Sequence, residues 1–247
     1  MVIHRLKPKS GFSHFLHIGL MILLPALLYV LVRMGFVPLA ASLVVLSKWR
    51  MFAVRPRYWP ANLRANGVDL TIGFATVIFM SNSNSASWQL VWAVAYASWL
   101  LFIKPGSSIW KTSLQAFLAQ TAGLMALFLA LGDAPLYVLV LLVWMICYGV
   151  ARHFFTSFEE PYTSLYAHTW GYFAAALTWL LGHWLVYYGI VAQPTLLLTV
   201  LGFGMAALYY LGQTDRLSVM VRRNFVVMMV AIVLVVILLT DWSGGTV

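Results

Sequence analysis

The sequence predicts an all-α protein, a polytopic bundle of membrane-spanning helices, and two observations carry this prediction. Hydrophobic residues make up 63% of the 247 positions and charged residues only 9%, whereas soluble domains average about 45–50% apolar and about 25% charged residues. The apolar runs are long and do not alternate with polar residues, which is typical of transmembrane helices rather than of barrel strands. We therefore expect one integral membrane domain over residues 1–247, with no soluble domain.

Nine apolar segments follow one another along the chain. They cover approximately residues 14–32, 35–53, 66–81, 87–103, 113–131, 134–150, 163–190, 194–211 and 223–240. The second segment has only 14 uncharged residues between Arg33 and Lys48, and the third is short and carries Asp69 near its start. Because a span needs about 20 apolar residues, two arrangements stay open: nine spans, or seven spans with 35–53 and 66–81 forming a re-entrant hairpin.

The cations favour nine spans and predict an orientation. With nine spans, 14 of the 15 Lys and Arg residues fall on one side of the membrane and only Arg33 falls on the other. Since short cytoplasmic gaps carry the excess of Lys and Arg, we expect the N-terminus in the cytoplasm and the C-terminus outside. A hairpin would place the basic connector at a tip within the membrane, which is costly.

The net charge of +9 resides in these short gaps. We therefore assign it to orientation and to anionic lipids at the cytoplasmic face, and we expect no nucleic-acid partner. The first apolar run is longer than the core of a signal peptide and no cleavage pattern follows it. We expect an uncleaved first span in a bacterial plasma (inner) membrane. The single cysteine, Cys147, excludes an intrachain disulfide and a cysteine metal cluster.

Basic and aromatic side chains alternate along the connector between the second and third segments. The candidates for binding lipid headgroups there are Lys48, Arg50, Arg55, Arg57 and Arg64. Such groups bind phosphate and attract anionic lipids, as a lipid-modifying enzyme or a lipid transporter requires. The second interpretation is an interfacial anchor for the neighbouring helices.

Asp69 has a local explanation in the sequence. Asn66 stands three residues before it, a spacing that favours a helix N-cap at Asn66 with an acid in the first turn. The alternative is an ion pair between Asp69 and Arg64.

The stretch before the seventh segment holds the only adjacent acids, Glu159 and Glu160. Neighbouring helical residues point about 100° apart, and Pro161 disfavours helical geometry at Glu160, so nothing makes the two carboxylates converge. We expect Pro161 near the first helical position and both acids at the positive end of the helix. The alternative is a cation or proton site at the cytoplasmic mouth.

A stripe of polar and aromatic residues runs along the seventh segment at helical spacing and includes His168, Tyr172, Trp179 and His183. Polar side chains in a span rarely face lipid, so we expect this stripe to point into the bundle as a polar lining. The alternative is a set of helix-packing and interfacial residues. Gln120 in the fifth segment is a second lining candidate, and its alternative is adhesion between helices.

The histidine spacing limits metal and cofactor chemistry. His168 and His183 lie about 22 Å apart along a helix, which excludes a shared metal ion. We expect no metal and no cofactor, although one haem at the level of His168, with His14 or His17 as the second axial ligand, stays open.

Three functions remain compatible with the sequence. The first is a transporter, a permease-like protein or a membrane subunit that handles a small or amphiphilic solute. The second is a noncatalytic scaffold that assembles with other membrane proteins or with further copies of itself. The third is a lipid-phosphate-handling enzyme that uses the connector over residues 48–64. No hydrolase, nucleotide-binding or zinc-protease motif is present in the chain, so we favour a non-enzymatic role.

Overall fold

The computed structural model describes the backbone of residues 12–240 and the side chains of residues 18–240. The main helices there are α1 (Phe12–Arg33), α2 (Val37–Leu46), α3 (Trp59–Ser81), α4 (Ala86–Ser98), α5 (Ile109–Leu131), α6 (Leu136–Thr156), α7 (Thr163–Leu181), α8 (Gln193–Gln213) and α9 (Val219–Leu238). Short helical turns are η1 (Trp49–Met51), η2 (Pro56–Tyr58), the π-helix η3 (Trp99–Ile103) and η4 (Gly182–Trp184). Strands β1 (Tyr187–Tyr188) and β2 (Val191–Ala192) form a small antiparallel hairpin.

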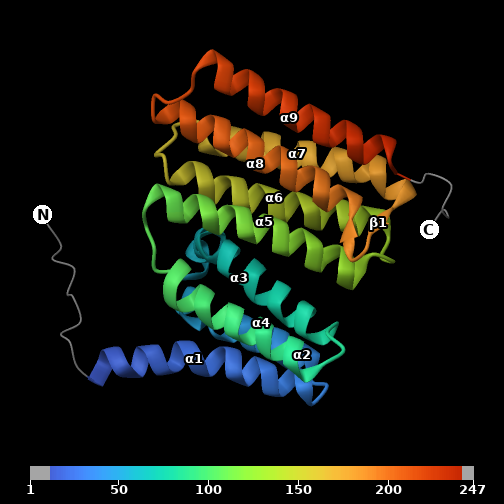
Figure 1. The fold of residues 1–247 in the computed structure, drawn as a ribbon. Coiled ribbons are helices and arrows are strands. Elements are labelled where there is room, and N and C mark those ends of the chain that lie inside the picture. Colours follow the sequence, from blue (N-terminus) through green and yellow to red (C-terminus); the bar gives the residue numbers. More distant parts are fainter. Residues whose placement is uncertain (1–11, 241–247) are drawn as a thin grey trace, which may run out of the picture.

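The helices lie side by side in one layered bundle (Figure 1). α1, α2 and α4 surround α3, which packs on α5. α6 packs on α5 and α7 packs on α6, and α8 and α9 complete the opposite side. One cluster of buried apolar residues joins α1–α4 to α5 and α6, and a second joins α5, α6, α7 and α8. Helix α9 lies at the edge, where Met229 is its one buried residue.

Six helices of the described chain are long and apolar enough to cross a membrane, which is typical of an integral membrane protein. They are Pro56–Ser81, which joins η2 to α3, Ala86–Ile103, which joins α4 to η3, α5, α6, α8 and α9. The described part of α1, Ile18–Arg33, and the whole of α2 are shorter apolar helices. Helix α7 has 19 residues but is not among the six.

The second and third predicted segments differ from the observed helices. Helix α2 has only 10 residues, about 15 Å of helix, half of what a span requires. Helix α3 begins at Trp59, seven residues earlier than predicted, so it is a full-length helix instead of one arm of a re-entrant hairpin. The expected N-cap at Asn66 is wrong, because Asn66 lies inside α3 and donates its side-chain N–H to the Asn62 carbonyl over 2.9 Å.

The seventh predicted segment, 163–190, is also too long. Helix α7 ends at Leu181, and the chain then passes through η4 and the β1–β2 hairpin. The hairpin turn contains Gly189, whose φ of +64° lies in the left-handed region that glycine adopts without strain. The apolar residues after Leu181 therefore form a turn at the end of the bundle rather than two further helical turns.

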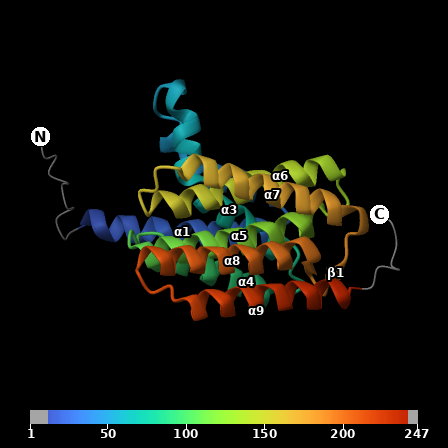
Figure 2. The same ribbon diagram turned by 90° about the horizontal axis from the view of Figure 1, so that it is seen from above.

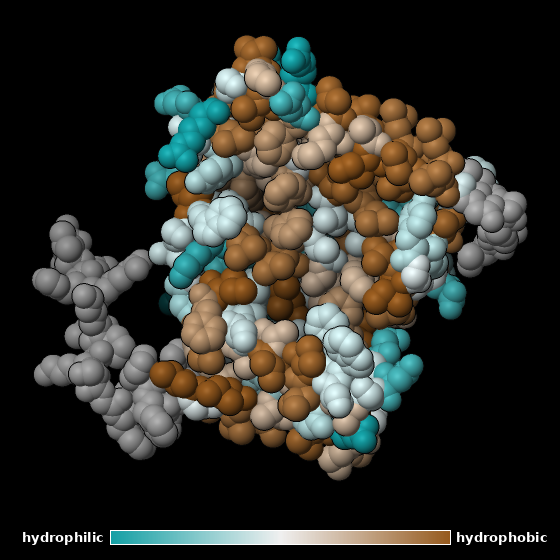
Figure 3. Space-filling model, in the orientation of Figure 1, coloured by the Kyte–Doolittle hydropathy of each residue, from teal (hydrophilic) through white to brown (hydrophobic). Residues whose placement is uncertain are grey.

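Cations gather at one end of the bundle, called the basic end below. It carries the α2–α3, α4–α5, α6–α7 and α8–α9 connections and holds 11 of the 12 Lys and Arg residues in the described chain. Arg33 lies at the opposite end. Figure 3 shows apolar surface across the middle of the bundle and hydrophilic groups towards its ends. The connector with η1, η2 and the start of α3 projects sideways from the bundle (Figure 2).

Candidate functional site

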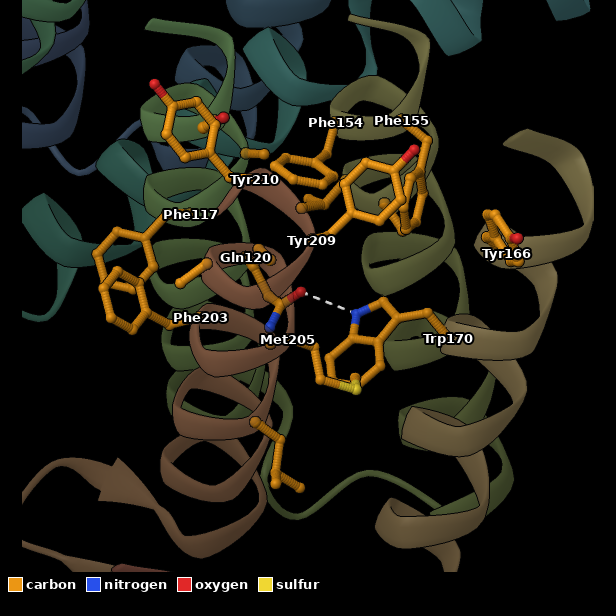
Figure 4. Close-up of a pocket in the computed structure, with 18 of the residues that line it drawn as sticks. Phe117, Gln120, Phe154, Phe155, Tyr166, Trp170, Phe203, Met205, Tyr209 and Tyr210 are labelled. Atoms are coloured by element: carbon orange, nitrogen blue, oxygen red, sulfur yellow. Dashed lines mark hydrogen bonds between the residues drawn. The ribbon is translucent and has the colours of Figure 1, made fainter. Parts of the chain in front are cut away.

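A large pocket lies between helices α5, α6, α7 and α8 in the half of the bundle next to the basic end (Figure 4). Its volume is about 760 Å³. The lining comes from α5 between Trp110 and Gln120, α6 between Val150 and Phe155, α7 between Tyr166 and Phe173, α8 between Leu201 and Leu211, and Phe225 of α9. The α8 stretch alone is about 15 Å long, so the pocket extends from the basic end to near the middle of the helices.

Gln120 lies at the deep end of this pocket and has partners on two other helices. Its Nε2 donates to the Leu198 carbonyl of α8 over 2.8 Å, and its Oε1 accepts from Nε1 of Trp170 in α7 over 3.0 Å. Gly202 makes the approach of α8 possible, because a Cβ there would lie 2.5 Å from Nε2 of Gln120. Gln120 therefore bonds to two other helices and also borders the pocket.

The two adjacent acids separate at the basic end of the pocket. The Glu160 carboxylate accepts a hydrogen bond from the hydroxyl of Tyr209, a pocket residue, and Nε2 of Gln213 donates to the same hydroxyl over 3.0 Å. Glu159 is exposed and has a φ of +54°. Glu160 is thus the acid at the pocket mouth, whereas Glu159 lies outside it.

The predicted place of these acids at a helix start is corrected by the structure. Helix α7 begins at Thr163 with Tyr162 as its N-cap and has no acid in its first turn. Pro161 therefore precedes the cap instead of occupying the first helical position.

The predicted stripe on α7 lies on the outside of the bundle. Tyr172 is 62% exposed and Trp179 53%; His168 is half-buried and His183 is exposed. The face of α7 that packs inward carries small residues such as Ala167, Gly171 and Ala174, because small side chains let helices approach closely. The expectation that the stripe points into the bundle is therefore wrong for the single chain.

Both histidines of the stripe bind backbone carbonyls of their own helix region. Nδ1 of His168 donates to the Ser164 carbonyl over 2.6 Å, and Nδ1 of His183 donates to the Trp179 carbonyl over 2.7 Å. In residues 18–240 no three His, Cys, Asp or Glu side chains converge as a metal site. The side chains of His14 and His17, considered for a haem with His168, lie outside the described residues.

A buried charge cluster lies on the other side of α5. The Asp69 Oδ2 atom is 2.8 Å from Nζ of Lys48 and 2.7 Å from Nζ of Lys104, and its Oδ1 accepts from Nε1 of Trp99 over 3.3 Å. The alternative pairing of Asp69 with Arg64 is not found, because Arg64 donates to the Pro60 carbonyl. Lys48 lies outside the candidate spans, and burial lowers the pKa of its ammonium although Asp69 acts in the opposite direction.

A second polar pair anchors the chain around this cluster. Nε2 of Gln115 donates to the carbonyls of Ile103 and Gly106 over 2.7 and 3.1 Å, and its Oε1 lies 2.9 Å from Nε2 of His153. Because the Gln115 nitrogen faces carbonyls, its oxygen must be the acceptor towards His153, and the His153 proton therefore sits on Nε2. These bonds hold the α4–α5 connection against α6.

The five residues predicted to bind lipid headgroups do not share one environment in the connector. Lys48 turns inward to Asp69, whereas Arg50, Arg55, Arg57 and Arg64 are exposed. Arg57 lies over the ring of Tyr58 at 4.6 Å, and Phe52 packs edge-on against Trp59 at 5.5 Å. The exposed part combines cations and aromatic rings, as interfacial segments do.

Sequence reasoning missed Trp170 and Tyr209 at the pocket and Lys104 and Trp99 at the charge cluster. The only sequence signal for Lys104 was its place directly after an apolar run. Comparison of the chain with models of known protein families, with curated proteins and with solved structures found no match. The described chain is thus an apolar helix bundle with an apolar pocket and a buried charge cluster.

Proposed function

We propose that this membrane protein handles an amphiphilic solute and binds the apolar part of that solute in the pocket between α5, α6, α7 and α8. A transporter, a permease-like protein or a membrane subunit of a transport system uses such a site. The observation that carries the proposal is a pocket of about 760 Å³ with an apolar and aromatic lining. This volume falls within the roughly 300–1,000 Å³ of small-molecule sites.

The chemistry of the deep end supports an apolar ligand group. Both sides of the Gln120 amide are already bonded to Trp170 and Leu198. No unpaired amide there requires a polar ligand atom, and an unpaired one would cost about 1–3 kcal/mol. The deep half of the pocket is therefore suited to a hydrocarbon chain or ring, which it holds by close packing rather than by hydrogen bonds.

The chemistry of the mouth supports a polar group at the other end of the ligand. Tyr209, Glu160 and Gln213 form a hydrogen-bonded chain there, next to the cations of the basic end. A solute with its apolar part near Gln120 would place its polar part at these residues. The lipid-phosphate enzyme has less support, because Glu159 and Glu160 diverge and do not provide a paired acid and base.

Photochemical labelling of the full chain tests the proposal. The protein is reconstituted in zwitterionic nanodiscs and irradiated with a diazirine-bearing 16-carbon fatty acid, and labelled peptides are mapped by mass spectrometry. We expect labels on pocket residues such as Phe203 and Met205, and we expect Ala207→Phe, which fills the pocket, to remove most of them.

The matched control is Ala176→Phe, which places the same side chain on the exposed face of α7. We expect this variant to label like the wild type. Labelling spread over α1 and α9, or labelling of pocket peptides that Ala207→Phe leaves unchanged, would show that the pocket is not the binding site.

A further inference from the structure

We propose that the cluster of Lys48, Asp69 and Lys104 binds one phosphate group, carried either by a lipid headgroup or by a soluble phosphate. This site is separate from the apolar pocket, because none of its three side chains lines that pocket. A negative result at either site leaves the proposal for the other site unaffected.

The cluster carries an unbalanced positive charge. Two ammonium groups contact a single carboxylate oxygen, so the three side chains together carry one excess positive charge. Within the described residues no second carboxylate pairs with either lysine. The other described acids lie in the connections at the bundle ends, and Glu160 is bonded to Tyr209.

Lys48 and Asp69 are largely shielded from water. The side chain of Lys48 is 10% exposed and that of Asp69 15%. An ammonium held away from water without full neutralisation is costly, and a bound anion removes that cost. Burial is the first cause of the lowered pKa of Lys48, and the neighbouring Asp69 carboxylate offsets this effect only in part.

The ammonium groups of the cluster have N–H donors to spare, and these donors can be reached from the surface. An ammonium has three N–H donors, and Asp69 accepts from only one on Lys48. Lys104, with 32% of its side chain exposed, opens the cluster to the surface at the basic end. A phosphate has several acceptor oxygens and bridges two ammonium groups, and lysine binds phosphate as a point charge. A further carboxylate would supply less charge and fewer acceptors.

The test uses the full chain in zwitterionic nanodiscs and follows thermal unfolding by tryptophan fluorescence. One arm titrates inorganic phosphate against chloride at equal ionic strength. The other arm introduces phosphatidic acid into the nanodisc with no added phosphate. We expect one of the arms to raise the unfolding temperature; a response to inorganic phosphate identifies a soluble source, and a response to phosphatidic acid alone identifies a lipid source.

Two variants make the test specific. Lys104→Met removes the excess charge but keeps the Lys48–Asp69 pair, and we expect phosphate binding to weaken at least about tenfold, the loss of one charge-assisted hydrogen bond. Lys111→Met is the matched control, because it removes a lysine at the same end that has no carboxylate partner in the described chain. We expect it to bind phosphate like the wild type.

Asp69→Asn is a third variant, and phosphate should stabilise it more than it stabilises the wild type. It leaves two ammonium groups without their carboxylate, so we expect lower stability in chloride and a larger stabilisation by phosphate than in the wild type. The proposal is overturned if neither arm shifts the unfolding temperature, or if Lys104→Met and Lys111→Met reduce the shift equally. If Asp69→Asn does not fold, the comparison of Lys104→Met with Lys111→Met still tests whether the cluster binds phosphate.

Discussion

Trp170 donates its indole N–H to Oε1 of Gln120 over 3.0 Å, and this bond connects α7 to α5 at the deep end of the pocket. The same glutamine donates to the Leu198 carbonyl of α8. Three helices that are distant in sequence therefore meet at one amide, which fixes the walls of the pocket relative to one another.

Replacing Trp170 with Phe keeps an aromatic ring but removes the donor, so Oε1 of Gln120 is left buried and unpaired. We expect the free energy of unfolding to fall by about 1 kcal/mol, since hydrogen bonds between membrane helices are worth about 0.6–2 kcal/mol. Thermal unfolding in detergent measures the change. The double variant Trp170→Phe/Gln120→Leu should lose less than the sum of the two single variants; additive losses would argue against a direct bond.

The two lysines on Asp69 should substitute for one another. We expect Lys48→Met and Lys104→Met each to change the free energy of unfolding by about 1 kcal/mol or less, because one ammonium still neutralises the carboxylate. The double variant leaves a buried, unpaired carboxylate and should lose about 3–5 kcal/mol. Adding Asp69→Asn to the double variant should recover most of this loss, and denaturant unfolding would reveal whether it does.

Gly204 sets the contact between α8 and α9. A Cβ at this position would lie 2.0 Å from Sδ and 2.6 Å from Cγ of Met229, the one buried residue of α9. We expect Gly204→Leu to displace α9 and to cost about 1–3 kcal/mol, as overpacking does, with faster proteolysis in the α8–α9 connection. Gly149→Leu is the control, because a Cβ there meets no atom within 4 Å; equal sensitivity of both variants would contradict the assignment.

The hydroxyl of Tyr187 in β1 should make the stability of the folded protein depend on pH in the alkaline range. Burial, and then the charge of Asp133, raise the pKa of its hydroxyl above the ordinary 10.0, and the hydroxyl donates to the Phe128 carbonyl over 3.1 Å. A raised pKa in the folded state gives stability that is complete below pH 10.0 and is lost as the pH rises through the folded value. The difference in unfolding temperature between wild type and Tyr187→Phe should therefore narrow above that pH, and a constant difference would exclude this role.

Hydrophobicity along the chain predicted most helices well. The expected segments 113–131 and 194–211 correspond to α5 (Ile109–Leu131) and α8 (Gln193–Gln213) within a few residues, because long apolar runs leave the backbone no partner except itself. The same signal overestimated the lengths of α2 and α7. Apolar residues also fill short helices and turns at the end of a bundle, and hydropathy does not separate these from a span.

The site was less predictable because periodicity identifies a face of a helix but not its neighbour. The stripe with Tyr172 and Trp179 is regular, yet α7 packs through the small residues on another face. In lipid, apolar side chains gain little by leaving the outside, so close packing decides which face turns inward. Asp69 likewise meets Lys104, 35 positions later, only because α3 lies against α4.

The π-helix η3 gives the chain room to lose one residue between Trp99 and Lys104. Its turn is closed by the Lys104 N–H bonding to the Trp99 carbonyl five residues back over 2.9 Å, so it holds one residue more than an α-helical turn. Deleting Phe102, which is 70% exposed and contributes little packing, would leave this hydrogen bond spanning four residues, the span of an α-helical turn. Trp99 and Lys104 would then both keep their places beside Asp69. The wide turn therefore takes up one surplus residue without changing which side chains meet Asp69.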